Sequence, residues 1–289
     1  LEDVVARGRW TVAPSLRWER RADRFLAGAG GLLPPPAASA TEDGLSGKLA
    51  VRRALGRRLA LRATAGRVYR APSLLELFGD RGAVVGNPAL RPESGTKLEA
   101  GVSYETRDDA ARRHLSAEIV AFGSWIDDLV VFELNSQSTA VPRNVGRARI
   151  AGLEALVTWR GRRLALSASG TLQHAEDRSG GVLDGARLVG RPARLGSLTA
   201  DWTARRWSAR WDVTYVGENP SDPFDTPALR VPARVIHDAT FELRLGDAAR
   251  LALEARNVFD RRTVDVLRFP LPGRVLLVRL RIGPDGDAR

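Results

Sequence analysis

Few side chains in this sequence could carry out acid–base, nucleophilic or metal chemistry. The three histidines, His114, His174 and His237, stand far apart, and the chain contains no cysteine. Asp127 and Asp128 are adjacent carboxylates that could hold a cation, but a solvated strand end is the more common setting for such a pair. No glycine-rich phosphate loop, nucleophile elbow or HExxH helix occurs. The sequence therefore predicts no enzyme, no metal site and no cofactor.

Arginine sets the charge of the chain, because only Lys48 and Lys97 among the 45 basic residues are lysine. Against 34 acidic residues this gives a formal net charge of +11. Such a basic chain is typical of nucleic-acid-binding proteins, whose arginines contact phosphates. A protein that distributes its arginines around a polar lumen has the same composition. The placement of the arginines along the chain therefore has to separate the two classes.

Apolar and polar residues alternate along most of the chain, which is the pattern of strands with one apolar face. In the segment 275–282 every even-numbered residue is apolar, whereas Arg279 and Arg281 occupy the opposite face. No apolar run reaches the roughly 18–20 residues of a transmembrane helix. We expect about twelve strands and no helix, with the strands near 8–19, 46–54, 58–69, 97–105, 113–125, 147–160, 164–173, 194–204, 207–215, 235–245, 250–257 and 275–282.

Short and long connections between these strands alternate without exception. The short ones lie near 55–57, 107–113, 161–162, 205–206 and 246–249. The long ones lie at about 20–45, 70–93, 133–146, 174–192, 217–233 and 258–273. This arrangement is typical of an antiparallel transmembrane β-barrel with tight periplasmic turns and long extracellular loops. A soluble β-sandwich has shorter strands and does not sort its loops by side.

The two faces of the strands indicate which side meets lipid. Tryptophan and tyrosine gather near the ends of the apolar faces, where the aromatic girdles of membrane barrels lie. An arginine on the lipid side costs roughly 2–4 kcal/mol near the bilayer centre, so the charged faces are expected to line the lumen. The arginines then surround a lumen and its rims instead of forming one patch, which disfavours nucleic-acid binding.

Five distinctive segments follow one another along the chain, at 69–79 with 86–93, 126–130, 144–154, 191–194, and 257–260 with 270–274. In this order they resemble the barrel of the TonB-dependent outer-membrane receptors, and most of all the cobalamin and siderophore receptor branch. The resemblance covers about residues 60–282. It implies an all-β fold, an antiparallel transmembrane β-barrel in which this chain supplies about twelve of 22 strands. Residues 1–282 would be the C-terminal portion of the barrel, and 283–289 a polar tail.

Several residues in these segments have local structural roles that the sequence predicts. Pro88 and Pro92 stiffen an extended segment outside the strands, and Glu93 opens the next strand, where an arginine of the lumen could pair with it. A bulge or a close backbone approach is expected at Gly152, which would turn Glu154 toward the lumen. The other positions singled out in these segments are Pro72, Asn87, Asn257, Phe259, Asp260 and Gly273.

The resemblance also implies a function for the whole protein. It would capture a metal chelate or cofactor, of the ferric siderophore or cobalamin class, in the outer membrane of a Gram-negative bacterium. The TonB complex would supply energy by engaging a region upstream of this chain and remodelling a plug domain. Since the chain lacks methionine and begins at Leu1, we expect it to be cut from a longer protein, without the plug and the upstream strands. The polar tail replaces the aromatic residue with which the family usually ends.

Ligand contacts are expected in the long loops at about 70–93, 133–146, 217–233 and 258–273. Four arginines in these loops would favour an anionic ligand, namely Arg81, Arg91, Arg143 and Arg230. Two other interpretations remain open. The strands could close on themselves as a small porin-like barrel, with Trp10 and Leu280 in adjacent strands. Alternatively, the chain could be a soluble basic β protein that binds nucleic acid.

Overall fold

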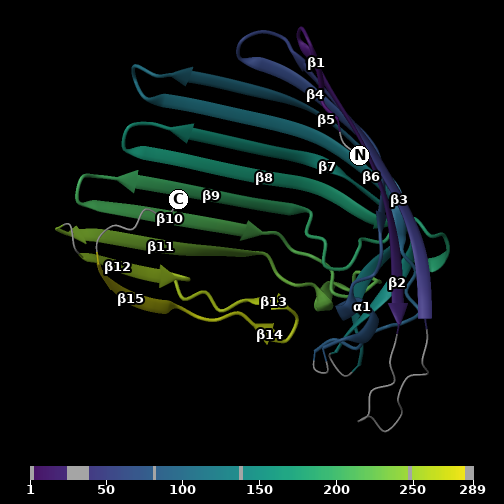
Figure 1. The fold of residues 1–289 in the computed structure, drawn as a ribbon. Helices are drawn as coiled ribbons and strands as arrows, with labels where there is room; N and C mark the ends of the chain where they lie inside the picture. The colour runs from purple at the N-terminus through teal and green to yellow at the C-terminus, as the bar shows by residue number, and fades with distance from the viewer. Residues whose placement is uncertain (1–2, 25–38, 81–82, 137–138, 247–248, 284–289) are drawn as a thin grey trace.

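The structure is a computed structural model that describes residues 3–24, 39–80, 83–136, 139–246 and 249–283. Within these ranges thirteen strands form one antiparallel sheet, and each strand pairs with its neighbours in chain order (Figure 1). The predicted all-β fold is confirmed. Its strands are β1 (Val5–Arg7), β2 (Trp10–Arg24), β3 (Ser39–Ala54), β4 (Leu59–Arg70), β5 (Glu93–Asp108), β6 (Arg113–Leu134), β7 (Ala140–Arg160), β8 (Leu164–Asp177), β9 (Arg194–Thr203), β10 (Trp207–Val216), β11 (Arg234–Leu245), β12 (Ala249–Arg256) and β15 (Val275–Ile282).

The strand that the sequence did not predict is β1, which pairs with the first residues of β2. Gly8 has a φ of 60°, a conformation that glycine adopts without steric cost, and it turns the chain between the two strands. The predicted strand at 8–19 therefore begins with the turn of a tight hairpin, and the strand itself runs from Trp10 to Arg24.

The long connections carry the remaining elements. They are the helix α1 (Leu74–Phe78), two 3₁₀ turns (Gly181–Leu183 and Pro227–Leu229) and a small hairpin of β13 (Val264–Val266) and β14 (Phe269–Pro270). The prediction of no helix is wrong at α1, where Ser73 accepts a hydrogen bond from the amide of Glu76 and the Glu76 carboxylate accepts one from the amide of Ser73. Such a capping box starts a helix even in a short segment. No helix in the described ranges is long and apolar enough to span a membrane.

The sheet curves into an open arc, with β1 and β15 at its two ends (Figure 1). These two strands do not pair within the described residues. Trp10 of β2 and Leu280 of β15 thus lie near opposite ends of the strand order. The alternative of a small barrel that closes on itself is therefore not what this structure shows.

One face of the sheet is apolar although its side chains are exposed. Leu198 of β9 pairs with Ala168 of β8 and Val213 of β10 on this face and is 44% exposed. Exposed apolar surface of such extent marks contact with a membrane. We call it the apolar face, and its exposed members include Leu61, Leu98, Ile119, Leu153, Leu198, Trp202, Phe241, Leu253 and Val278.

The opposite face carries the charges, as predicted for a lumen. The guanidinium of Arg62 lies 2.9 Å from the carboxylate of Glu118, and that of Arg279 lies 2.9 Å from Glu254. We call this the polar face. Arg279 and Glu254 lie on the neighbouring strands β15 and β12, whereas Arg62 of β4 reaches across β5 to Glu118 of β6, and both pairs keep their charges away from lipid.

The connections differ in length between the two ends of the sheet. At one end, on the left in Figure 1, lie turns of three or four residues at 55–58, 109–112, 161–163 and 204–206. We call this the short-turn end, and the other the long-loop end. One predicted long loop is wrong, because β6 and β7 extend into 133–146 from both sides and leave only 135–139 between them. The run of β-branched and aromatic residues Val130 to Phe132 extends the strand.

The alternation of faces reverses near the long-loop end of β6 and β7, but not where it was expected. Asp128 has a φ of 56° and stands opposite Gly146, and beyond this point Leu129 shares a buried cluster with Ile150 on the polar face. At Gly152 the pairing with both neighbouring strands is continuous, so of the two features expected there the bulge is absent and the close backbone approach is present. A Cβ at Gly152 would lie 2.3 Å from the carbonyl oxygen of Leu172, which leaves room only for glycine.

Arg70, the last residue of β4, ties the loop of residues 71–92 to the sheet. Its guanidinium donates to both oxygens of Glu93, at 2.5 and 2.9 Å, and to those of Glu76 in α1, at 2.9 and 3.1 Å. Glu93 also accepts a hydrogen bond of 2.8 Å from the amide of Val130 in β6. One arginine therefore joins two strands and a helix, as predicted for Glu93.

The Glu76 carboxyl is buried, with 7% of the residue exposed. Burial raises its pKa, but the hydrogen bonds from Arg70 and Ser73 outweigh burial and hold the pKa below its ordinary value of 4.5. The charged form is thus favoured in the folded state. The carboxylate stabilises the loop above the ordinary pKa, and this contribution is lost as the pH falls through the lower folded value.

The apolar face predicts a strong asymmetry between neighbouring residues of β9. Leu198→Arg should lower the free energy of unfolding by about 2–4 kcal/mol, because it places a charge in hydrocarbon. Ser197→Arg, on the polar face beside it, should change that free energy by less than about 1 kcal/mol. Urea unfolding of the natural gene product in lipid vesicles measures both values. Equal losses for the two variants would contradict the assignment of the faces.

The Arg70 anchor predicts that Glu76→Gln loosens residues 71–92. Loss of a hydrogen bond to a charged group costs about 1.5–3 kcal/mol, and this loop depends on it. The protection of the amides of α1 against hydrogen exchange, corrected for the pH dependence of the intrinsic rate, should be lower in the variant at neutral pH, whereas the wild type should fall to the same protection only well below pH 4.5. Glu105→Gln, at the short-turn end, is the control. Unchanged exchange in Glu76→Gln at neutral pH would refute the anchor.

Candidate functional site

The long loops at one end of the sheet are joined to each other by backbone contacts. The amide of Val85 donates to the carbonyl of Ala140 at 2.9 Å, which links the β4–β5 loop to the β6–β7 connection. The amide of Gly190 donates to the carbonyl of Pro220 at 3.0 Å, which links the β8–β9 loop to the β10–β11 loop. Because the strands follow chain order, these loops stand side by side. They form one connected surface.

Asn144 fastens the segment around Arg91 to the β6–β7 hairpin. Its side-chain amide donates to the carbonyls of Arg91 at 3.0 Å and Asp128 at 2.6 Å, and its oxygen accepts from the amide of Arg91 at 2.9 Å. Asn87 makes a similar contact, donating to the carbonyl of Pro142 at 3.0 Å. The segment lies outside the strands and contains Pro88 and Pro92, as predicted. Both asparagines hold the loop onto the hairpin.

The first proline singled out in the loop has a different partner. The carbonyl oxygen of Pro72, just before α1, accepts a hydrogen bond from the guanidinium of Arg21 in β2. Arg21 and Arg70 thus hold the start of the loop from two strands, although β2 and β4 do not pair with each other.

A pocket of about 320 Å³ lies where three of these loops meet. Glu133 and Arg143 of the β6–β7 hairpin, Arg187 of the β8–β9 loop and Phe224 of the β10–β11 loop line it, together with apolar residues such as Leu188. The guanidinium of Arg143 lies 3.6 Å from the carboxylate of Glu133, and its side chain is 65% exposed. The Phe224 ring is largely exposed. The pocket thus offers a cation, an anion and an aromatic face to a small ligand.

Arg230 belongs to a network of two arginines and two carboxylates behind the pocket. Its guanidinium lies 2.8 Å from Asp225 and 3.0 Å from Glu218, and Arg187 lies 3.7 and 3.8 Å from the same two groups. The hydrogen bond to Asp225 raises the pKa of Arg230 above its ordinary value. The charges of the four groups cancel, so the network closes the β10–β11 loop on itself.

The structure places the four predicted arginines differently. Arg143 lines the pocket directly, Arg230 supports it through the carboxylates it shares with Arg187, and Arg91 is joined to it through Asn144. Arg91, Arg143 and Arg230 each already have a carboxylate partner, which is Asp128 for Arg91. Arg81 lies outside the described residues.

Asn257 organises the corner between β12 and β15. It is buried, with a φ of 49°, and its side chain donates to the carbonyls of Arg261 at 2.9 Å and Pro272 at 3.2 Å and accepts from the amide of Arg261 at 2.9 Å. Asp260 accepts from the amide of Arg274 at 2.8 Å, and a Cβ at Gly273 would lie 2.8 Å from its carboxylate. These contacts join the two ends of the loop between β12 and β15.

Phe259 and the histidines take part in local contacts. Phe259 lies edge-on to His237, with ring centroids 4.8 Å apart. His114 and His174 each lie 3.1 Å from a carboxylate, that of Glu105 and that of Glu176 respectively. Within the described residues no three histidine, aspartate or glutamate side chains are grouped so that they could hold a metal ion.

Glu154 shares the polar face with Ile150 and pairs across the strands with Val120 and Thr171. The pocket residues Glu133, Arg187 and Phe224 were not predicted from the sequence, and neither was Asp225 of the ion-pair network. Loop residues have no periodic pattern that assigns them a face, and so the sequence gives no sign of which loops meet. The one available signal was the pairing of charges along the chain at 218, 225 and 230, which suggests a loop closed by ion pairs.

The comparisons with known proteins agree with this architecture. A family profile described as "TonB dependent receptor-like, beta-barrel" matches residues 1–258. An iron-regulated outer membrane virulence protein of Vibrio cholerae is 27% identical over 214 residues, which are 66% of this chain and 32% of that protein. The chain thus spans about a third of the length of this curated relative.

Solved structures show the same fold. The siderophore receptor PiuA from Acinetobacter baumannii superposes with a TM-score of 0.75 at 17% identity, over 95% of this chain and 41% of that chain. The copper transporter OprC superposes with a TM-score of 0.71 at 20% identity, over 96% of this chain and 45% of that chain. Because the profile matches most of the residues, the chain belongs to the family of TonB-dependent receptor β-barrels of the Gram-negative outer membrane.

Proposed function

We propose that this chain forms the C-terminal barrel wall and outer loops of a receptor that takes up an anionic metal chelate of the ferric siderophore class. The pocket between the β6–β7, β8–β9 and β10–β11 loops is the observation that carries the proposal. Its position at the long-loop end corresponds to the extracellular side of membrane barrels. Relatives named for iron regulation and siderophore reception support the choice of ligand class over cobalamin.

Arg143 is the residue proposed to contact the ligand. Its ion pair with Glu133 is long and exposed, and an exposed pair of this kind contributes only about 0–1 kcal/mol. An acidic group on a ligand can therefore replace Glu133 at little cost and form a bidentate pair with the guanidinium. Phe224 offers an aromatic face beside it.

Arg91 and Arg230 are proposed to act differently from Arg143. Arg230 has two carboxylate partners at 2.8 and 3.0 Å and lies behind the pocket, so it positions Arg187 and the β10–β11 loop. Arg91 holds the β4–β5 loop through Asp128. Arg81 remains a proposed ligand contact from its place in the sequence. The four arginines thus divide into candidates for contact and supports of the loops.

The proposed uptake needs parts outside this chain. The TonB complex would act through a region upstream of it, and a plug domain would release the ligand into the lumen formed by the polar face. The carboxylates and arginines of that face, such as Glu118 and Arg62, would then line the ligand's path. No chemical step is assigned to any residue, in keeping with a family of receptors and transporters.

Alanine substitution of Arg143 in the natural gene product should weaken binding of ferric enterobactin, used as the probe, by about tenfold, the effect of losing a hydrogen bond between charged groups. Arg57→Ala, at the short-turn end, should leave binding unchanged. Fluorescence quenching on intact cells measures both affinities. Equal affinity in wild type and Arg143→Ala would refute the role of Arg143.

Growth experiments separate active uptake from a passive pore. A host that relies on this protein for iron should grow on a ferric siderophore only while its TonB system is intact. Ferric enterobactin and ferric citrate are offered to this host, and cyanocobalamin is offered to a second host that needs external cobalamin and relies on this protein to take it up, because cyanocobalamin supplies no iron. Growth that persists without TonB would contradict the proposal and favour a porin-like pore, and use of cyanocobalamin alone would replace the siderophore class by cobalamin.

A further inference from the structure

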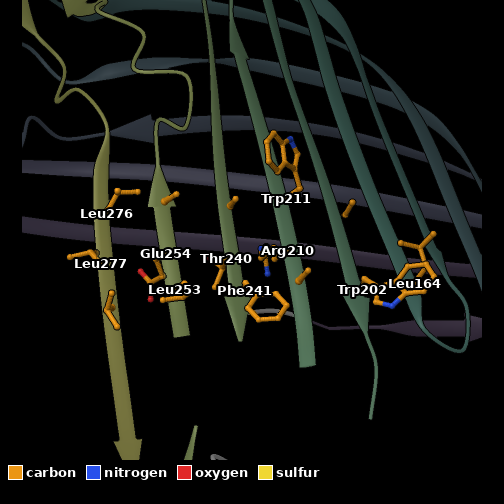
Figure 2. A pocket seen from close by; sticks show the side chains of 15 residues that line it. Leu164, Trp202, Arg210, Trp211, Thr240, Phe241, Leu253, Glu254, Leu276 and Leu277 are labelled. Atoms are coloured by element: carbon orange, nitrogen blue, oxygen red, sulfur yellow. The ribbon is translucent and has the colours of Figure 1, made fainter. Parts of the chain in front are cut away.

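A second cavity lies far from the loops, on the apolar face of the last strands. It is a groove of about 680 Å³ that extends from β8 across β9 to β12 and reaches β15. Figure 2 shows Trp211 on one side of it and Trp202 and Phe241 on the other, with Leu253 and Leu276 toward β15. The charged residues at its border have partners elsewhere, since Arg210 pairs with Asp212 and Glu254 with Arg279. The groove is therefore apolar in character.

The register of the strands creates this groove. Ala209 of β10 lies between Trp202 of β9 and Phe241 of β11, and Ala239 lies between Trp211 and Ala255. Small side chains in rows between large ones leave a hollow in an otherwise even surface. The hollow lies on the apolar face, which faces lipid in the membrane barrels of this family.

One end of the groove opens toward the short turns. Leu164, which lines it, follows the turn 161–163, and Trp202 is the last residue but one of β9, before the turn 204–206. The rings of Trp202 and Trp207 stack with centroids 6.5 Å apart, and those of Trp207 and Phe241 with centroids 5.9 Å apart. Aromatic rings in this position belong to the girdle at the membrane interface.

Exposed arginines occupy the turns that adjoin the strands of the groove at this end. The turns are held together laterally, because the amide of Thr203 donates to the carbonyl of Arg163 at 2.7 Å and that of Arg244 donates to the carbonyl of Arg206 at 2.8 Å. No acidic residue occurs in 160–163, 204–206 or 244–246, and Asp247 lies outside the described residues. The arginines of the turns 161–163 and 204–206, which we call the arginine rim, are Arg162, Arg163, Arg205 and Arg206, whereas Arg160 and Arg244 are strand residues of the polar face.

The rim differs from the arginines of the long-loop end. Arg91, Arg143 and Arg230 all have carboxylate partners, whereas in the described part of the chain no ion pair involves a member of the arginine rim. A cluster of exposed guanidinium groups without counter-ions attracts anions and pairs well with phosphate. The rim thus supplies the charge that the groove lacks.

We propose that the arginine rim and the groove together bind an anionic phospholipid of the inner leaflet, with its phosphate at the rim and one acyl chain in the groove. Short turns of membrane barrels face the periplasm, so the rim lies at the head-group level of that leaflet. A phospholipid carries a phosphate and its acyl chains on one glycerol, which matches the juxtaposition of rim, aromatic rings and groove. A nucleic acid or a free phosphate would use the rim but leave the groove empty.

Quenching of tryptophan fluorescence by brominated lipid tests the proposal, with the natural gene product in phosphatidylcholine nanodiscs that contain a minor fraction of brominated phosphatidylglycerol. Brominated phosphatidylglycerol should quench more strongly than brominated phosphatidylcholine, because Trp202, Trp207 and Trp211 surround the site. Replacement of the four rim arginines should lower the affinity for phosphatidylglycerol relative to phosphatidylcholine by about tenfold or more, in the variant Arg162→Gln, Arg163→Gln, Arg205→Gln, Arg206→Gln. One arginine near an anionic surface raises the affinity by about fivefold.

Two further variants show which part of the site acts. The control Arg57→Gln, Arg58→Gln, Arg112→Gln, Arg113→Gln removes the same charge from other short turns and should keep the preference. Ala209→Leu fills the groove without altering charge and should reduce quenching by brominated phosphatidylglycerol. A shift in gel mobility on heating shows that this variant is still folded.

Four results would overturn the proposal. An equal loss of the preference for phosphatidylglycerol in the control variant would mean that the lipid is attracted to any basic turn. Unchanged quenching in Ala209→Leu would mean that no acyl chain occupies the groove. Full competition by inorganic phosphate would identify free phosphate as the ligand of the rim. Displacement of the lipid by a single-stranded oligonucleotide would identify a nucleic-acid surface.

Discussion

The hydrogen-bonded ladder between neighbouring strands is the interaction on which the rest of the molecule depends. Hydrocarbon offers no partner for a backbone amide or carbonyl, so each strand that crosses it must pair on both sides. The uninterrupted order from β1 to β12 and β15 meets this demand within the arc. The ladder also fixes the faces, because every second side chain points to lipid. The apolar face, the polar face and the sorting of loops by length all follow from it.

The sequence was sufficient for features that obey this period of two. Leu276 to Ile282 show their face by alternation, and the turns at 161–163 and 204–206 show themselves as interruptions between alternating runs. Features that depend on the backbone conformation of a single residue could not be predicted from the sequence pattern. Gly8 splits the first strand and Asp128 reverses the faces of β6 through positive φ angles, which leave the pattern of residue types nearly unchanged. The reversal was therefore assigned to Gly152, where small size serves close packing instead.

The candidate site was harder to predict because loops meet by tertiary contacts. Arg143 and Arg230 were recognised by type and position, but their partners Glu133, Asp225 and Glu218 come from different points of the chain. Whether an arginine is available to a ligand depends on those partners. The contrast with the arginine rim is visible in residue type, because carboxylates stand near the arginines of the long loops and no acidic residue occurs in the turns 161–163 and 204–206.

The reversal at Asp128 gives the outer part of the β6–β7 hairpin apolar contacts on both sides. Leu129 and Val131 pack with Leu188 of one loop, while Val130 packs with Leu77 and Leu90 of another. The β8–β9 loop and the β4–β5 loop are thus both packed against the β6–β7 hairpin in the absence of a ligand. The conformational entropy of these loops is then lost when the protein folds and not when a ligand binds, so the surface is preorganised. Selectivity in such a surface rests on shape as much as on charge.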